Sequence, residues 1–233
     1  AADTPFGTRT LNAQRVRQAS NTLDSDVDAL TYSKIPPLPE TRDEVMSLAK
    51  ILQANLEKDL FLGARPTRQS VLEANKLNTL LQKKVLVFAT HGLLAGDLPN
   101  LSQPALAMAA TASDKDSPLL TLEDVLGLNI NADWVVLSAC NTAGADGRAE
   151  EALSGLARGF FYAGGRSLLV THWSVESESA MLLTTKTFEV YNRDAGLRRS
   201  EAVRQAMLEV MKMPAYQHPA FWAPYALVGE GGR

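Results

Sequence analysis

Several features that often define a protein class are missing from this chain of 233 residues. It has one cysteine, so no disulfide can form within the chain, which excludes a small secreted scaffold held together by disulfides. It has no apolar run approaching the roughly 18 residues that a membrane span requires. Its net charge is −3, whereas nucleic-acid-binding domains usually carry a basic surface. We therefore expect no membrane partner and no nucleic-acid partner. A single thiol is compatible with a reducing or an oxidising compartment, and the location that we expect is cytoplasmic.

Common ligand-binding and catalytic motifs are absent as well. Neither of the glycine-rich phosphate-binding patterns, G-x-x-x-x-G-K-[ST] and G-x-G-x-x-G, occurs in the chain, so nothing favours a nucleotide-binding protein. The G-x-S-x-G pattern of serine hydrolases is also missing. The three histidines and the cysteine lack the close spacing of zinc ligands. We expect neither a metal nor a cofactor.

What the chain does contain is the material for a large α/β domain. Hydrophobic residues make up 45% of it, which is enough for a full core. Short apolar runs rich in β-branched and aromatic residues predict buried parallel strands, and apolar residues at helical spacing predict helices between them. The class is therefore α/β, with a mostly parallel central sheet covered by helices on both faces. The main predicted strands are 85–90, 134–139, 167–171 and 225–228, and the main helices begin near 41, 150, 178 and 200.

Local signals add detail to this pattern. Thr41 and Thr121 each begin a sequence typical of a capping box, and Thr67 is a candidate N-cap. A short strand is predicted at Asp59–Gly63, and segments 105–110 and 119–120 are predicted to pair as a small hairpin. Gly164 and Gly165 are expected to end the helix that begins near 150.

His91 and Cys140 are the strongest candidates for chemistry. Each follows a predicted strand, and active sites of open α/β sheets lie outside the carboxyl ends of the strands. This placement suggests a cysteine–histidine dyad, with Cys140 as the nucleophile and His91 as the general acid and base. Gly92 has no side chain, so its backbone N–H and that of Cys140 are candidates for an oxyanion hole. A buried structural cysteine and a structural histidine are the alternative.

The residues around these two positions resemble the signature blocks of the CHAT domain family. CHAT domains are caspase-like peptidase domains that often occur beside tetratricopeptide repeats in bacterial proteins. The resemblance extends in order through roughly residues 40–230. The segments that carry it are Ala89-Thr90-His91-Gly92, Leu137–Thr142, Gly155–Phe161, Ala163-Gly164-Gly165, Leu169–Val175, Glu201-Ala202 and His218–Gly229.

The resemblance implies a caspase-like three-layer sandwich and a cysteine endopeptidase that acts on a protein or peptide substrate through His91 and Cys140. It implies the peptidase domain over residues 41–233. Residues 1–40 lack strong periodicity and end in a rigid proline-rich stretch with Pro36, Pro37 and Pro39, so they are expected to form an arm or linker. The resemblance further implies a regulated bacterial assembly in which a tetratricopeptide-repeat region or a regulatory protein is the partner. No such repeat is recognisable in the chain itself.

The resemblance also implies where a substrate side chain would bind. The residue two positions before the cysteine, Ser138, should line the pocket for the residue before the scissile bond. Trp173, Ser174 and Glu176 should form another wall. Glu176 or Asp146 would place a negative charge there and favour Arg or Lys in the substrate, whereas core packing of Trp173 and a helix-start role for Glu176 are the alternatives.

Other interpretations remain open from the sequence. His172 also follows a predicted strand, but no glycine follows it, and a buried histidine bonded to backbone is expected there; His218 is expected to be structural. The chain is alternatively a catalytically silent interaction module with a protease-like surface. A third possibility is a zymogen-like state in which the loops 93–118 or 141–150 become ordered only when a partner binds.

Overall fold

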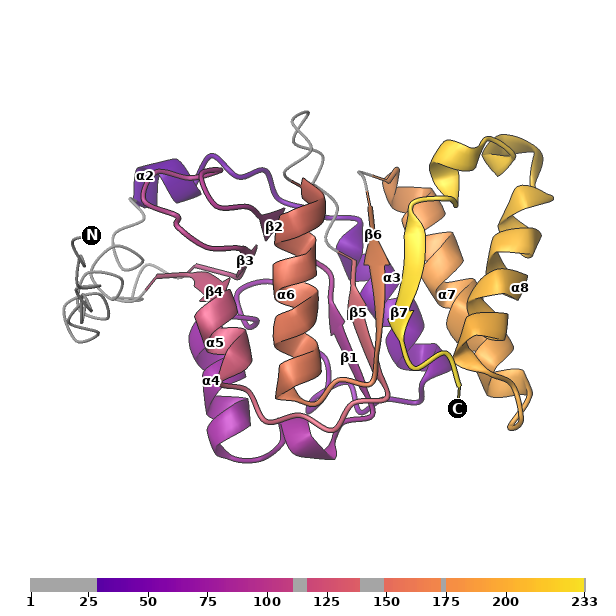
Figure 1. Ribbon diagram of the computed structural model, residues 1–233, viewed down its shortest axis with the longest axis horizontal. Helices are drawn as coiled ribbons and strands as arrows, with labels where there is room; N and C mark the ends of the chain where they lie inside the picture. The colour runs from indigo at the N-terminus through magenta and orange to yellow at the C-terminus, as the bar shows by residue number, and fades with distance from the viewer. Residues whose placement is uncertain (1–28, 111–116, 139–148, 173–174, 233) are drawn as a thin grey trace, which may run out of the picture.

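The computed structural model describes residues 29–110, 117–138, 149–172 and 175–232 (Figure 1). In this part of the chain, four strands form the central sheet in the order β1-β5-β6-β7. The first three run parallel and the last runs antiparallel to β6, which confirms the mostly parallel sheet. The strands are β1 (Val85–Phe88), β5 (Trp134–Leu137), β6 (Ser167–Thr171) and β7 (Tyr225–Gly229).

Helices cover both faces of this sheet, as Figure 1 shows. The core on one face contains side chains of α5 (Leu122–Leu126) and α6 (Ala149–Ala163). The core on the other face contains side chains of α3 (Thr41–Ile51), α7 (Ser177–Arg193) and α8 (Arg199–Met211). The molecule is therefore a three-layer α/β/α sandwich, as the sequence predicted.

Alternation along the strands explains why the sheet can be buried on both sides. In β5, Val135 and Leu137 join the core under α6, whereas Trp134 and Val136 join the core under α7. Successive strand residues point to opposite faces, so an entirely apolar strand provides two hydrophobic surfaces at once. Burial of a single large side chain such as Phe160, which is 0% exposed, contributes about 1.5–3 kcal/mol.

A second, smaller sheet lies beside the central one. It consists of β2 (Gly92–Leu93), β3 (Ala105–Ala107) and β4 (Leu119–Thr121), and both pairings are antiparallel. The pairing of β3 with β4 confirms the hairpin expected from the sequence; residues 111–116 between them lie outside the described residues. Tyr32, the last residue of α2 (Ala29–Tyr32), and Ile35 pack against the core of this sheet.

Several helix boundaries follow from local sequence. Thr67 accepts a hydrogen bond from the amide of Ser70 at the start of α4 (Arg68–Lys76), and Thr121 forms a complete capping box with Asp124 at the start of α5. Gly164, with φ of 112°, ends α6, as expected. Three short 3₁₀ segments complete the described elements: Leu80–Gln82, Pro214–Tyr216 and Pro219–Phe221.

Two local predictions are wrong. Asp59–Gly63 is not a strand: Phe61 is exposed beneath the guanidinium of Arg65, and the preceding Asn55 side chain accepts two backbone amides in a local turn. The apolar run there is too short to add a buried strand. Thr41 does not cap α3, because Glu40 is the N-cap residue and the Thr41 hydroxyl donates to the Leu38 carbonyl.

Candidate active site

The candidate site lies where the parallel strands end. Because β1, β5 and β6 run in one direction, their carboxyl ends share one edge of the central sheet, the upper edge in Figure 1. His91 follows β1 at this edge and is 7% exposed. Its carbonyl accepts the amide of Ala107 at 2.9 Å, and the neighbouring Thr90 hydroxyl donates to the carbonyl of Ala107. The backbone at His91 is therefore fixed to β3.

The imidazole of His91 has one hydrogen-bond partner among the described residues. Its Nε2 atom lies 2.8 Å from the carbonyl oxygen of Pro36, 55 residues earlier in the chain. A carbonyl can only accept, so Nε2 must carry the hydrogen of this bond. In the neutral ring the other nitrogen, Nδ1, then holds the free electron pair. The contact therefore orients the ring and assigns the basic position to Nδ1.

Gly92 is placed so that its amide points away from β3. The Ala107 amide bonds to the His91 carbonyl, so the next pair of the ladder, Gly92 with Leu106, is the non-hydrogen-bonded kind. Amides of such pairs face outward from the partner strand. This orientation leaves the Gly92 N–H directed away from the small sheet, as an oxyanion donor requires.

Cys140 lies outside the described residues, but the strand that leads to it is well defined. In the parallel register of β1 and β5, Phe88 is the partner of Leu137. His91 is three residues beyond Phe88 (91 − 88), and Cys140 is three residues beyond Leu137 (140 − 137). Adjacent strands are about 4.8 Å apart. The two candidate residues therefore follow equivalent positions of neighbouring strands.

Ser138, the last described residue before Cys140, is buried and points toward the helices of one face. Its hydroxyl donates to Oε2 of Glu44 in α3 at 2.9 Å. Oε1 of the same carboxyl lies 2.9 Å from the hydroxyl of Thr184 in α7. Glu44 is only 3% exposed, and burial raises the pKa of its carboxyl, while the bonds to Ser138 and Thr184 act in the opposite direction.

Sequence patterns did not identify Pro36 or Glu44. Pro36 belongs to a proline-rich stretch, and a backbone carbonyl leaves no signal in the sequence. Glu44 is the fourth residue of the capping-box pattern that begins at Thr41, which predicts a local role at the helix start. Its spacing of four from the buried Leu48 was the available signal, since residues four apart share one face of a helix.

Of the other predicted substrate-binding residues, only Glu176 is described. It is exposed and is the N-cap of α7, where its carboxylate accepts the amides of Glu178 and Ser179 at 3.0 and 2.8 Å. Trp173 and Ser174 lie outside the described residues, as does Asp146. A helix-start role for Glu176 is therefore present in the structure.

The other two histidines have separate surroundings. The expectation that His172 is buried is wrong, because the residue is exposed; its amide donates to the Pro224 carbonyl. Strand β6 ends at the preceding residue, so the side chain leaves the packed region. His218 is structural, since its Nδ1 accepts the amide of Ala220 at the start of a 3₁₀ turn.

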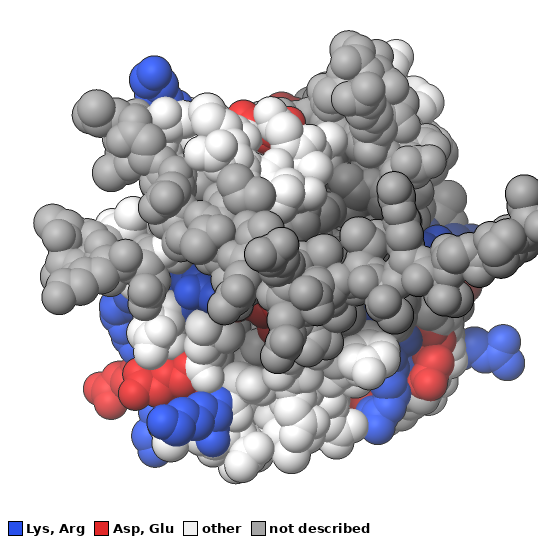
Figure 2. All heavy atoms as spheres, turned by 60° about the vertical axis from the view of Figure 1, so that its left-hand side comes forward, with Lys and Arg blue, Asp and Glu red and all other residues white. Residues whose placement is uncertain are grey.

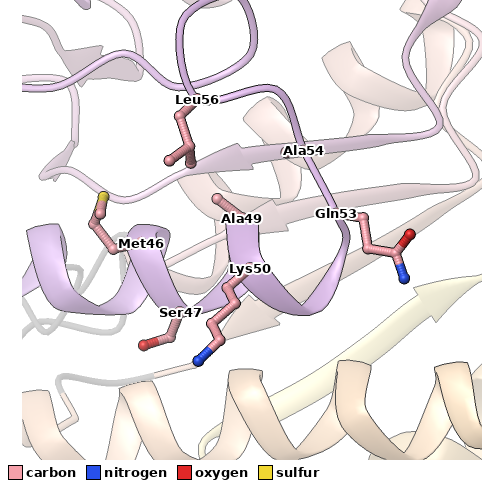
Figure 3. Close-up of a pocket in the computed structure, with 7 residues that line it drawn as sticks. All are labelled: Met46, Ser47, Ala49, Lys50, Gln53, Ala54 and Leu56. Atoms are coloured by element: carbon pink, nitrogen blue, oxygen red, sulfur yellow. The ribbon is translucent and has the colours of Figure 1, made fainter.

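A surface hollow of about 480 Å³ lies away from these residues, on the outer side of α3. Figure 3 shows Met46 and Ala49 of the helix facing Leu56 of the following loop. Ser47, Lys50, Gln53 and Ala54 complete the lining. The hollow contains none of the predicted site residues, so it is distinct from the candidate active site.

The face in Figure 2 shows Lys and Arg side chains interspersed with Asp and Glu. Its described residues thus form no continuous basic stripe of the kind that follows a nucleic-acid backbone. Among the helices of the described residues, none is both long and apolar enough to cross a membrane.

The α/β/α sandwich and the family comparison together place the chain in the class of caspase-like, protease-related domains. The family model described as "CHAT domain" matches residues 7–230, and the chain belongs to this family.

Curated relatives support this assignment. The chain is 28% identical over 216 residues to Tetratricopeptide repeat protein 28 of Mus musculus, a match that covers 83% of this chain and 9% of the relative. It is 27% identical over 215 residues to the Homo sapiens protein of that name, covering 83% of this chain and 8% of the relative. The chain therefore spans less than a tenth of the length of these relatives.

Proposed function

We propose that this chain is a cysteine endopeptidase that cleaves protein or peptide substrates through Cys140 and His91. The observation that supports this most strongly is the register of the two central strands. Cys140 and His91 follow paired residues by the same number of positions, at the edge where α/β domains place their active sites. The CHAT family assignment supports the same conclusion.

In the proposed reaction, Nδ1 of His91 takes the thiol proton of Cys140, and the sulfur attacks the peptide carbonyl carbon. As the tetrahedral intermediate collapses, the carbon–nitrogen bond breaks and His91 gives the proton to the leaving amine. A thioester remains on Cys140. Water then attacks the thioester with His91 as the base, which releases the carboxylic acid and restores the thiol.

The surroundings of the dyad suit each step. The Pro36 carbonyl holds Nε2–H and leaves Nδ1 available for the proton. The amide of Gly92 points away from β3, and with the amide of Cys140 it is the proposed donor pair for the oxyanion. The chemistry needs no metal or cofactor.

Terminus-resolved mass spectrometry of a peptide library tests this proposal. The wild-type chain should generate new termini, Cys140→Ala should generate none, and His91→Ala should cut about 10²- to 10⁴-fold more slowly. His172→Ala is the matched control, because His172 also follows a parallel strand but is exposed. Cleavage by Cys140→Ala at the wild-type rate would exclude the dyad. No Cys140-dependent cleavage would support the alternative, an interaction module without turnover.

The same experiment tests the substrate pocket. Ser138, Trp173, Ser174 and Glu176 are the proposed lining residues for the side chain before the cut. Enrichment of Arg or Lys at that position would support a negative contribution from Glu176, and Glu176→Gln should then reduce the enrichment. An unchanged profile would limit Glu176 to its capping bonds at the start of α7.

The proposed peptidase also has a proposed partner region and cellular location. The names of the relatives support a tetratricopeptide-repeat region as the partner of the domain. We further propose a cytoplasmic, regulated assembly of bacterial origin, although the relatives named above are mammalian. Residues 41–233 would form the peptidase domain, and residues 1–40 an arm that supplies the Pro36 carbonyl.

A further inference from the structure

A buried carboxyl joins three elements at the described end of the strand that leads to the proposed nucleophile. Glu44 of α3 contacts Ser138, at the end of β5, through one oxygen and Thr184 of α7 through the other, each at 2.9 Å. All three residues are buried, with exposures of 3%, 6% and 0%. Ser138 is two residues before Cys140. The carboxyl thus fixes the last described point of the chain before the nucleophile.

The hydrogens of this cluster can be counted. The Thr184 hydroxyl has one hydrogen, but its oxygen lies 2.9 Å from Glu44 Oε1, 2.9 Å from the Ala180 carbonyl and 3.2 Å from the Met181 carbonyl. If Glu44 is protonated, its O–H donates to Thr184, and Thr184 donates to the Ala180 carbonyl. Ser138 donates to the remaining carboxyl oxygen. Each of the contacts at 2.9 Å then has a hydrogen.

The electrostatic environment also favours the protonated form of Glu44. The described residues around Glu44 include no Lys or Arg within ion-pair distance, and the groups that bond to it are neutral hydroxyls. A buried carboxylate without a cation is costly, so the group takes up a proton instead. Burial acts in that direction on Glu44.

We propose that Glu44 is a positioning residue for Cys140. Glu44 connects the end of β5 to α7 and thereby sets the direction in which the chain leaves the sheet toward the nucleophile. This inference rests on the proposed role of Cys140. Glu44 itself touches no reacting atom. Its effect is on geometry, where a shift of about 1 Å at a reacting group can lower a rate 10²-fold.

Gln is the informative replacement, because its amide matches a protonated carboxyl. The oxygen of Glu44→Gln accepts from Ser138, and the nitrogen donates to Thr184. We expect kcat within about twofold of wild type for Glu44→Gln. We expect kcat at least about tenfold lower for Glu44→Ala, because the orientation of the nucleophile changes.

Thr187→Val is the matched control. Thr187 is a buried threonine of the same helix whose hydroxyl bonds only within the helix, to the Leu183 carbonyl at 2.8 Å. The Thr187→Val variant should have a lower melting temperature than the wild type but an unchanged kcat. Thr184→Val keeps the carboxyl but breaks the link to α7, and should lower kcat several-fold. This variant keeps the test decisive if Glu44→Ala does not fold.

The second readout is the rate at which iodoacetamide alkylates Cys140, which requires no peptide cleavage. If the wild type cuts no peptide, the endopeptidase proposal fails, whereas the order of alkylation rates still tests Glu44. Wild-type rates in Glu44→Ala would overturn the inference. So would an equal loss in Glu44→Gln, which would mean that a charge is required, or an equal loss in Thr187→Val.

Discussion

The Nε2 atom of His91 lies 2.8 Å from the carbonyl oxygen of Pro36, so a segment far from the central sheet in sequence fixes the ring of the proposed base. The carbonyl precedes Pro37, whose ring restricts the backbone of Pro36 further. Two consecutive prolines therefore hold the acceptor in place with little loss of chain entropy on folding.

A more flexible backbone at Pro36 should orient His91 less well and should therefore lower the reactivity of Cys140. Pro36→Gly keeps the carbonyl but should lower the free energy of unfolding by roughly 0.4–1 kcal/mol, because the unfolded chain gains backbone freedom. The less rigid acceptor should also lower the Cys140 alkylation rate and kcat. Pro39→Gly is the control, because the Pro39 carbonyl bonds to the Arg42 amide at the start of α3. Equal losses in the two variants would contradict a specific role for Pro36.

Gly164 should be irreplaceable by alanine. Its φ is 112°, and a Cβ atom there would lie 2.1 Å from the carbonyl oxygen of Ile130. Gly164→Ala should lower the free energy of unfolding by at least about 2 kcal/mol in urea titrations. Gly63 also has a positive φ, 64°, but open space around it. Gly63→Ala should cost about 1 kcal/mol, and a cost as large as that of Gly164→Ala would refute the steric explanation.

Glu44 should give the fold a pH dependence. Burial raises the pKa of Glu44 above the ordinary value of 4.5, so the folded state keeps a proton that the unfolded chain releases. The unfolded state then binds fewer protons, and stability falls as pH rises from about 4.5 through the raised pKa. Urea midpoints across this range should fall less in Glu44→Gln than in wild type. If the difference between the urea midpoints of Glu44→Gln and wild type stayed constant across this pH range, that result would contradict a raised pKa of Glu44.

The two threonines that looked alike in sequence should differ in stability measurements. Thr121 accepts the Asp124 amide and completes a capping box, so Thr121→Ala should cost about 1 kcal/mol. Thr41 caps no amide, and its hydroxyl only donates to the Leu38 carbonyl. Thr41→Ala should therefore cost less in thermal unfolding. The reverse order would show that these hydrogen bonds do not determine helix stability here.

These threonines also show which parts of the structure are predictable from sequence. The apolar runs at Val85–Phe88 and Trp134–Leu137 predicted buried parallel strands because burial on both faces leaves little alternative for such residues. The capping pattern at Thr41 failed because the same hydroxyl satisfied a carbonyl in the preceding turn. Local signals were therefore reliable where burial was strong and ambiguous where several hydrogen bonds were equally available.

Within the candidate site, His91 and Gly92 followed from their position after a strand, and the structure adds what holds them. The contacts of His91 with Pro36 and of Ser138 with Glu44 span 55 and 94 residues. Each depends on how separate layers meet, which no local pattern encodes. Glu44 was the harder case, because a buried charged residue runs against the usual preference of Glu for the surface.

The antiparallel direction of β7 has a consequence for synthesis. Tyr225, the first residue of β7, pairs with Thr171, the last residue of β6, so the final strand begins at the edge where the proposed dyad lies. Until that strand has left the ribosome, β6 lacks one neighbour and the sheet is open beside the site. Chains are made from the N-terminus at about 5–20 residues per second, so a nascent chain carries His91 and Cys140 for several seconds before the domain can close around them.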